Sequence, residues 1–292
     1  MYSASDVKEL RERTGAGMMD CKKALDASEG NMDKAIDWLR ENGIAKAAKK
    51  EGRIAAEGLT EAASNENEAV IFEVNCETDF VTKNEKFVNL MAELRRAFLF
   101  NKCDNYEEAL EVKLEDGKTV SERIVEATAT IGEKISFRRF QKFTKTDSQT
   151  FGVYSHMGGK ITSLVIIEGD NIDVARDIAM HNAAMHPLYV RPDAVPADVL
   201  EREKEIMKTE LINEGKPADK VDMILGGKVN KYYEEVCLEN QIYIKAENKE
   251  TVKQYAEANG CSIVDAIRYE VGEGIEKKQE NFAEEVMSQI NG

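Results

Sequence analysis

The sequence predicts an α+β fold that begins with a bundle of three helices. Apolar residues recur at helical spacing in the first 43 residues, apolar and polar residues alternate from Asn67 onward, and two helical stripes meet at Gly215 and Pro217. Periods of 3.6 and 2 residues distinguish helices from strands. We therefore expect an amino-terminal three-helix domain, two α+β subdomains with small antiparallel sheets, an inserted antiparallel helical hairpin and a carboxyl-terminal helix.

The amino-terminal helices are separated by glycine signals. Ser5 or Asp6 is placed to cap the first helix, and Asn31 is placed to cap the third, which is expected to end before Gly43. These helices define a predicted domain at residues 1–43. Residues 44–58 contain lysine and arginine among alanines, which predicts a basic helical connector. Its basic face is either solvated or a contact surface.

The first predicted subdomain spans residues 59–145. Val70, Phe72, Val74 and Cys76 alternate with more polar neighbours, as in a strand with one buried face. Two helical stripes and a second alternating segment follow, at residues 87–98, 120–131 and 135–143.

The second predicted subdomain comprises residues 146–186 and 237–274 and repeats this plan. Strands are expected at residues 151–156, 161–168 and 263–271, with a helix starting near Ile172. The hairpin insertion occupies residues 187–236, where Gly215 ends one helix and Pro217 starts the next. Such an arm contacts either a partner or a second copy of the chain, so a homodimer is one open alternative. Residues 275–292 form the last module, with Phe282 and Val286 as apolar positions.

Composition disfavours several functional classes. The chain of 292 residues has a formal net charge of −15, from 55 acidic and 40 basic residues, which would repel a phosphate backbone. Direct binding of nucleic acid is therefore not expected. No apolar run approaches the roughly 20 residues that span a bilayer, and the first residues lack a signal-peptide pattern. We expect a cytoplasmic protein without membrane contact.

Cysteines and histidines give no sign of a metal, a cofactor or a disulfide framework. The five cysteines are odd in number, widely spaced and contain no C-x-x-C pair. His181 and His186 are five residues apart, so on a helix they point to different faces. No phosphate-binding loop and no Ser-His-Asp spacing is present. An enzyme would depend on its carboxylates, of which Glu77 and Asp79 are the nearest candidates.

The most informative segment is Thr78, Asp79, Phe80 and Val81, where an apolar strand leads into a carboxylate beside an aromatic ring. A pair of this kind at a strand end is either a turn with a buried anchor or a probe directed at another molecule. The residues alone leave both alternatives open.

Three motifs resemble the bacterial elongation factor Ts family. They are residues 7–25, which contain Thr14-Gly15-Ala16-Gly17-Met18-Met19-Asp20-Cys21, residues 78–81, and residues 268–277, which contain Tyr269-Glu270-Val271-Gly272-Glu273-Gly274. The motifs occur in the family's order and span almost the whole chain. The resemblance implies that the first three helices form a ubiquitin-associated-like domain. It also implies a guanine-nucleotide exchange factor, rather than an enzyme, that binds elongation factor Tu in its GDP-bound and nucleotide-free forms.

The resemblance assigns roles to particular residues. Thr78, Asp79, Phe80 and Val81 match the loop that disturbs the magnesium site of elongation factor Tu, with Phe80 as a wedge and Asp79 perturbing contacts that position the metal. Other positions match partner contacts, namely Met18, Met19, Lys22, Lys50, Ile131 and His156.

Structural alternatives exist for several of these residues. Met18 and Met19 could both pack within the helical bundle, Ile131 is typical of a core residue at a helix end, and His156 is typical of a turn. For the whole chain, the rivals are an enzyme and an adaptor that binds ubiquitin-like domains. The two-part α+β body exceeds what an adaptor requires.

Overall fold

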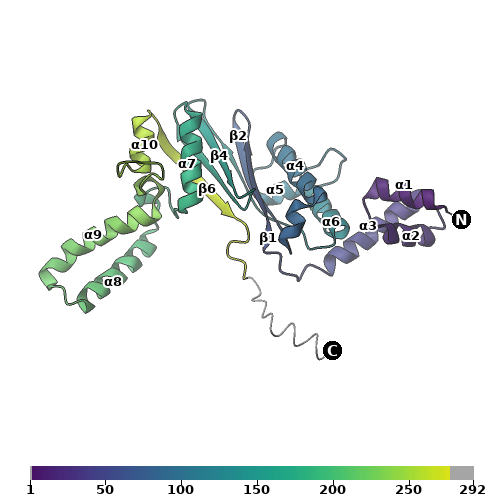
Figure 1. Ribbon diagram of the computed structural model, residues 1–292, viewed down its shortest axis with the longest axis horizontal. Coiled ribbons are helices and arrows are strands. Elements are labelled where there is room, and N and C mark those ends of the chain that lie inside the picture. Colours follow the sequence, from purple (N-terminus) through teal and green to yellow (C-terminus); the bar gives the residue numbers. More distant parts are fainter. Residues whose placement is uncertain (1, 277–292) are drawn as a thin grey trace. The chain divides into compact units, whose positions relative to one another are not determined.

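The computed structural model describes residues 2–276 (Figure 1). It has the expected α+β architecture with two small antiparallel three-stranded sheets, whose strand orders are β1-β2-β3 and β4-β5-β6. The six strands are β1 Glu57–Ser64, β2 Glu68–Cys76, β3 Ser136–Thr144, β4 Gln149–His156, β5 Ile161–Glu168 and β6 Ser262–Glu270. None of the helices in the described part of the chain is both long enough and apolar enough to cross a membrane.

The described residues divide into two compact units. The first comprises residues 2–61, 72–142 and 270–276, and the second comprises residues 62–71 and 143–269. Helical elements of the first unit are α1 Ala4–Thr14, α2 Met18–Ala27, α3 Met32–Ala48, η1 Asp79–Lys83, α4 Glu85–Phe100, α5 Tyr106–Glu111 and α6 Val120–Ile131. Those of the second are α7 Ile172–Met185, η2 Pro192–Ala194, α8 Ala197–Asn213, α9 Ala218–Val236, η3 Leu238–Asn240 and α10 Val252–Ala258.

Helices α1, α2 and α3 form the expected three-helix bundle. Ser3, rather than Ser5 or Asp6, caps α1, because its hydroxyl accepts from Asp6 N while the Asp6 carboxylate accepts from Ser3 N. Asn31 caps α3 as predicted. The bundle buries a small apolar core of Leu10, Cys21, Ala24, Leu25 and Ala35.

The predicted end of the third helix before Gly43 is wrong. Helix α3 continues to Ala48, since the residues after Gly43 include several strong helix formers. A Cβ atom at Gly43 would lie 3.3 Å from Ala129 Cβ of α6, so glycine here permits close helix packing. The signal that suggested a helix end instead serves a tertiary contact.

The expectation of one helical connector over residues 44–58 is also wrong in its second half. The helix stops at Ala48, and strand β1 begins at Glu57. Within β1, a Cβ atom at Gly58 would lie 2.2 Å from Val74 O, so only glycine fits beside the neighbouring backbone. Thr60 is the only β-branched residue of this strand, and it has no aromatic residue, so its sequence carries little strand signal.

The core of the first unit is aromatic. Phe98 of α4 contacts Phe72 of β2 edge-on, with ring centroids 5.3 Å apart, and also contacts Phe137 and Phe140 of β3. Residues 87–98 and 120–131 form α4 and α6 as their spacing predicts.

The first unit also contains a buried carboxylate. Glu73 is fully buried, and its two oxygens accept from Arg138, Arg139, Asn75 Nδ2 and Gly272 N. A buried charge is stable only when it is paired and hydrogen-bonded. The partners of Glu73 come from β2, from β3 and from the turn that follows β6, so the network joins these three segments.

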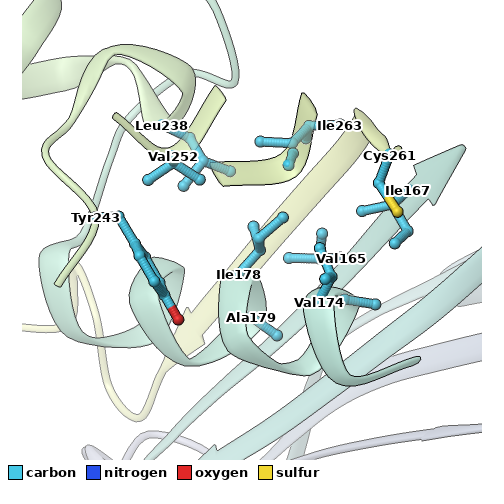
Figure 2. Close-up of a cluster of buried hydrophobic side chains, with 12 residues drawn as sticks. Val165, Ile167, Val174, Ile178, Ala179, Leu238, Tyr243, Val252, Cys261 and Ile263 are labelled. Atoms are coloured by element: carbon cyan, nitrogen blue, oxygen red, sulfur yellow. The ribbon is translucent and has the colours of Figure 1, made fainter. Parts of the chain in front are cut away.

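In the second unit, α7 packs against β4 and β5. The two strands pair antiparallel, with Val153 opposite Leu164. A Cβ atom at Gly152 would lie 2.1 Å from Ala175 O, so the glycine allows α7 to approach the sheet closely. Figure 2 shows the resulting cluster of buried apolar side chains from α7, β5, β6, η3 and α10, including Val165, Ile178, Leu238, Val252 and Ile263.

The inserted hairpin is confirmed as two antiparallel helices, α8 and α9. Gly215 adopts a φ of 73° and Pro217 occupies the amino-terminal cap of α9, as the turn chemistry predicts. Lys228 Nζ lies 2.9 Å from Glu210 Oε2, which joins the helices across their surface. Leu211 and Val221 are buried near the turn.

Candidate partner-binding site

The acidic-aromatic segment forms a turn of 3-10 helix rather than a continued strand. Strand β2 ends at Cys76, Thr78 is extended, and η1 begins at Asp79. The Thr82 hydroxyl donates to Asp79 O at 2.6 Å and closes this turn from within. Asp79 and Phe80 therefore follow helical geometry.

The segment contains the buried anchor expected of a turn, next to two exposed residues. Phe80 is 80 % exposed and Asp79 is also exposed, whereas Val81 is only 7 % exposed. Exposure of a phenylalanine side chain forgoes about 1.5–3 kcal/mol of burial. Val81 is thus the anchor of the turn, while Phe80 and Asp79 form its accessible tip.

The carboxylates of Glu77 and Glu133 hold the base of the segment. Each accepts a hydrogen bond from a backbone amide in the other residue's segment. Glu133 Oε2 accepts from Thr78 N at 2.9 Å and Glu77 N at 3.1 Å, and Glu133 Oε1 accepts from the Thr78 hydroxyl at 2.7 Å. In the opposite direction, Glu77 Oε1 accepts from Lys134 N at 2.6 Å. Arg53 Nη1 lies 3.3 Å from the Glu77 carboxylate. We call these reciprocal contacts between residues 77–78 and 133–134 the crossed clamp.

Lys50 and Ile131 lie next to the crossed clamp. Helix α6 ends at Ile131, and Gly132 adopts a left-handed φ of 94° at its end. Lys50 Nζ donates to Gly132 O. Partial burial, and then the nearby charge of Arg53, lower the pKa of Lys50. The structure therefore brings together three residues that the sequence singled out, namely Lys50, Ile131 and Thr78.

Met18, Met19 and Lys22 lie at the start of α2. Met18 is 54 % exposed and Met19 is 65 % exposed, so the alternative that both pack within the bundle is wrong. The buried face of α2 consists of Cys21, Ala24 and Leu25 instead. Lys22 is exposed as well. Two adjacent exposed methionines form a flexible apolar surface that can adapt to a partner.

Hydrogen bonds tie the amino-terminal bundle to the helices that flank the candidate loop. Lys86 Nζ, in the first turn of α4, donates to Gly15 O at 2.6 Å. Arg40 of α3 pairs with Glu122 of α6 at 2.7 Å. The first of these contacts links the loop before α2 to the helix that directly follows η1.

His156 belongs to the second unit, at the end of β4. Its ring is exposed and stacks on Tyr154, with centroids 6.2 Å apart, and its Nδ1 lies 3.5 Å from the Tyr154 hydroxyl. The next residue, Met157, is 71 % exposed with a φ of 49°. Met157 thus adds an exposed apolar side chain beside His156, at the hairpin turn that Gly158-Gly159 marks in the sequence.

The remaining predictions concern a metal site, the cysteines and the carboxyl-terminal apolar residues. Residues 2–276 contain no group of three or more histidine, cysteine, aspartate or glutamate side chains arranged to hold a metal ion. All five cysteines are buried, and burial raises the pKa of Cys237 to about 11. Phe282 and Val286 lie outside the described residues.

Comparison with known proteins identifies the chain. The sequence model described as elongation factor Ts matches residues 77–273. This match begins within the crossed clamp, includes the Asp79–Phe80 tip, Ile131 and His156, and spans more than half of the chain. The chain therefore belongs to the elongation factor Ts family, the nucleotide exchange factors that act on elongation factor Tu during translation elongation.

Proposed function

We propose that this chain binds GDP-bound elongation factor Tu and uses Asp79 and Phe80 to disturb its magnesium and phosphate site, so that GDP leaves faster. The single observation that carries the proposal is an 80 % exposed Phe80 on a turn whose neighbour Val81 is buried. A rigidly anchored apolar tip is suited to displacing another protein's side chains. It offers little to covalent catalysis.

The chemistry of the target explains why a small displacement suffices. Magnesium requires near-octahedral oxygen ligands and bridges the protein to the nucleotide phosphates. A wedge that shifts the supporting loops weakens this coordination, and Asp79 adds a negative charge or a hydrogen-bond acceptor beside it. By linkage, GDP and the exchange factor weaken each other's binding by the same free energy. The nucleotide-free form of elongation factor Tu is therefore the tight-binding partner.

Further contacts extend this surface. In the first unit, the exposed Met18, Met19 and Lys22 support contact with the GTPase domain of the partner. Lys50 and Ile131 lie directly behind the crossed clamp and are proposed contacts too. For the second unit we propose that His156, exposed at the end of β4, contacts the partner's β-barrel domain.

The hairpin of α8 and α9 is a further proposed contact surface. Exposed Ile206, Ile212 and Met223 support a contact role for α8 and α9, with a second copy of the chain as one candidate. Sedimentation of the chain alone over a range of concentrations tests that candidate.

A factor that acts in translation elongation would work in the cytoplasm.

The exchange assay tests the proposal directly. Elongation factor Tu is loaded with a fluorescent GDP analogue, excess unlabelled GDP is added, and release is followed with catalytic amounts of this chain. We expect intact protein to accelerate release, and Phe80→Ala and Asp79→Ala each to slow the accelerated rate by about tenfold or more. Phe100→Ala is the matched control, because Phe100 is 76 % exposed at the end of α4 and outside the site. Absence of any acceleration by the intact chain would refute the proposed function.

A further inference from the structure

The crossed clamp contains a side chain with no assigned role in exchange. Glu133 accepts three hydrogen bonds, and all three come from the two residues that precede the Asp79–Phe80 tip. Hydrogen bonds to an ionised carboxylate are stronger than those between neutral groups. Because all three hydrogen bonds hold one short segment, we expect Glu133 to fix the position of that segment as well as to stabilise the fold.

Local backbone geometry explains why a remote carboxylate is needed. Thr78 is the amino-terminal cap of η1, but its side chain makes no capping bond to that helix. Its hydroxyl donates to Glu133 instead. Meanwhile the left-handed Gly132 turns the chain sharply after α6 and delivers Glu133 to this position. The support of the loop thus comes from the end of another helix.

Support of this kind matters for a segment that has to deform a partner. A force that displaces side chains of the partner acts equally on Phe80, and a yielding base would let Phe80 move back. Ordering a loose loop on binding would also consume interaction free energy that could otherwise distort the partner. Functional side chains need to be held within about 0.5 Å of their working position by a supporting shell.

We propose that Glu133 is a positioning residue for nucleotide exchange, which fixes the pose of Asp79 and Phe80 through Thr78 and Glu77. The proposal rests on the proposed exchange function. Glu133 itself need not touch the partner. Its removal is expected to lower the rate at which bound nucleotide is released more than it lowers affinity for elongation factor Tu.

Two substitutions separate hydrogen bonding from charge. Glu133→Ala removes all three acceptor contacts. Glu133→Gln removes the charge but can keep the geometry, because its carbonyl oxygen can accept from both backbone amides while its amino group donates to the Thr78 hydroxyl. Thr78→Val removes only the hydroxyl contact. Glu108→Ala is the matched control, since the Glu108 carboxylate also accepts a backbone amide in the first unit, from Asp104 N at 2.9 Å.

The kinetic test measures release of the fluorescent GDP analogue over a range of concentrations of this chain. For Glu133→Ala we expect the maximal release rate to fall about tenfold, while the half-saturating concentration changes less than about threefold. Glu133→Gln should stay within about threefold of the intact chain, and Thr78→Val should lie between the two. Glu108→Ala should match the intact chain.

Amide hydrogen exchange of the free chain provides a second readout that requires no partner. Glu133→Ala should accelerate exchange at Glu77 N and Thr78 N, and Glu133→Gln should not. If the intact chain fails to accelerate nucleotide release, the proposed function fails, and these amides still report whether the clamp exists.

Three outcomes would overturn the positioning role while leaving the exchange function standing. They are a normal release rate in Glu133→Ala, a change confined to the half-saturating concentration, and equal losses in Glu133→Ala and Glu133→Gln. If Glu133→Ala does not fold by circular dichroism, Thr78→Val and Glu133→Gln decide the question in the same assays.

Discussion

Truncation of Glu73 is expected to destabilise the first unit strongly. The side chain is fully buried, and Glu73→Ala would remove the acceptor for Arg138, Arg139, Asn75 Nδ2 and Gly272 N together. Removal of one partner from a buried ion pair costs about 3–5 kcal/mol, because the remaining charge is left uncompensated.

The structure places the expected value at the lower end of this range. Arg139 Nη1 keeps an ion pair with Glu273 at 3.1 Å, and Asn75 Nδ2 keeps a contact with Glu57 O at 3.2 Å. Both arginine side chains are 26 % exposed, so water can partly replace the lost carboxylate. We therefore expect a loss of about 3 kcal/mol in the free energy of unfolding.

Native-state hydrogen exchange at β2 and β3 amides is the suitable assay, because a chain of two units need not unfold in a single step. Glu115→Ala is the control, since Glu115 and Arg96 form an exposed pair at 3.8 Å. That variant should change stability by less than about 0.5 kcal/mol. A loss below about 1 kcal/mol in Glu73→Ala, or one equal to that of the control, would refute the reasoning.

Three further predictions concern the second unit. His181 is buried with Nδ1 accepting from Ile244 N at 3.1 Å, and burial lowers its pKa, so the folded state holds the neutral ring. Because the unfolded state then binds more protons, the free energy of unfolding should fall as pH drops below about 6.5. Denaturant titrations should show a shallower fall for His181→Gln, and an equally steep fall in that variant would contradict the prediction. Gly152→Ala should destabilise this unit by more than about 2 kcal/mol, since its Cβ would meet Ala175 O at 2.1 Å. Gly226→Ala should instead stabilise α9 by about 0.5–1 kcal/mol, because nothing lies within 4 Å of its Cβ, and thermal melts that fail to separate the two variants would contradict this.

Local signals predicted most of the fold. Asn31 caps α3, Gly215 and Pro217 form the hairpin turn, and residues 161–168 form β5, because each depends on neighbours close in sequence. Elements with weak local signals were missed, namely β1, α5 and α10. Gly43 was misread because its function is to let α6 approach, which no local pattern reveals.

The candidate site likewise has features that local sequence predicts and features that only the structure reveals. Phe80 and Asp79 were identified from their place after an apolar strand and from family resemblance, while the burial of Val81 required the structure. Glu133 could not be linked to Thr78 from sequence, because 55 residues separate them and a lone glutamate after a helix carries no signal.

The crossed clamp also bears on the order in which the protein gains its activity. Its bonds join residues 55 to 57 positions apart, so a long loop has to close before they form. During synthesis, Phe80 leaves the ribosome well before Glu133, and until Glu133 arrives the tip has no fixed base. Competence for exchange should therefore appear only after α6 has folded and its end has docked.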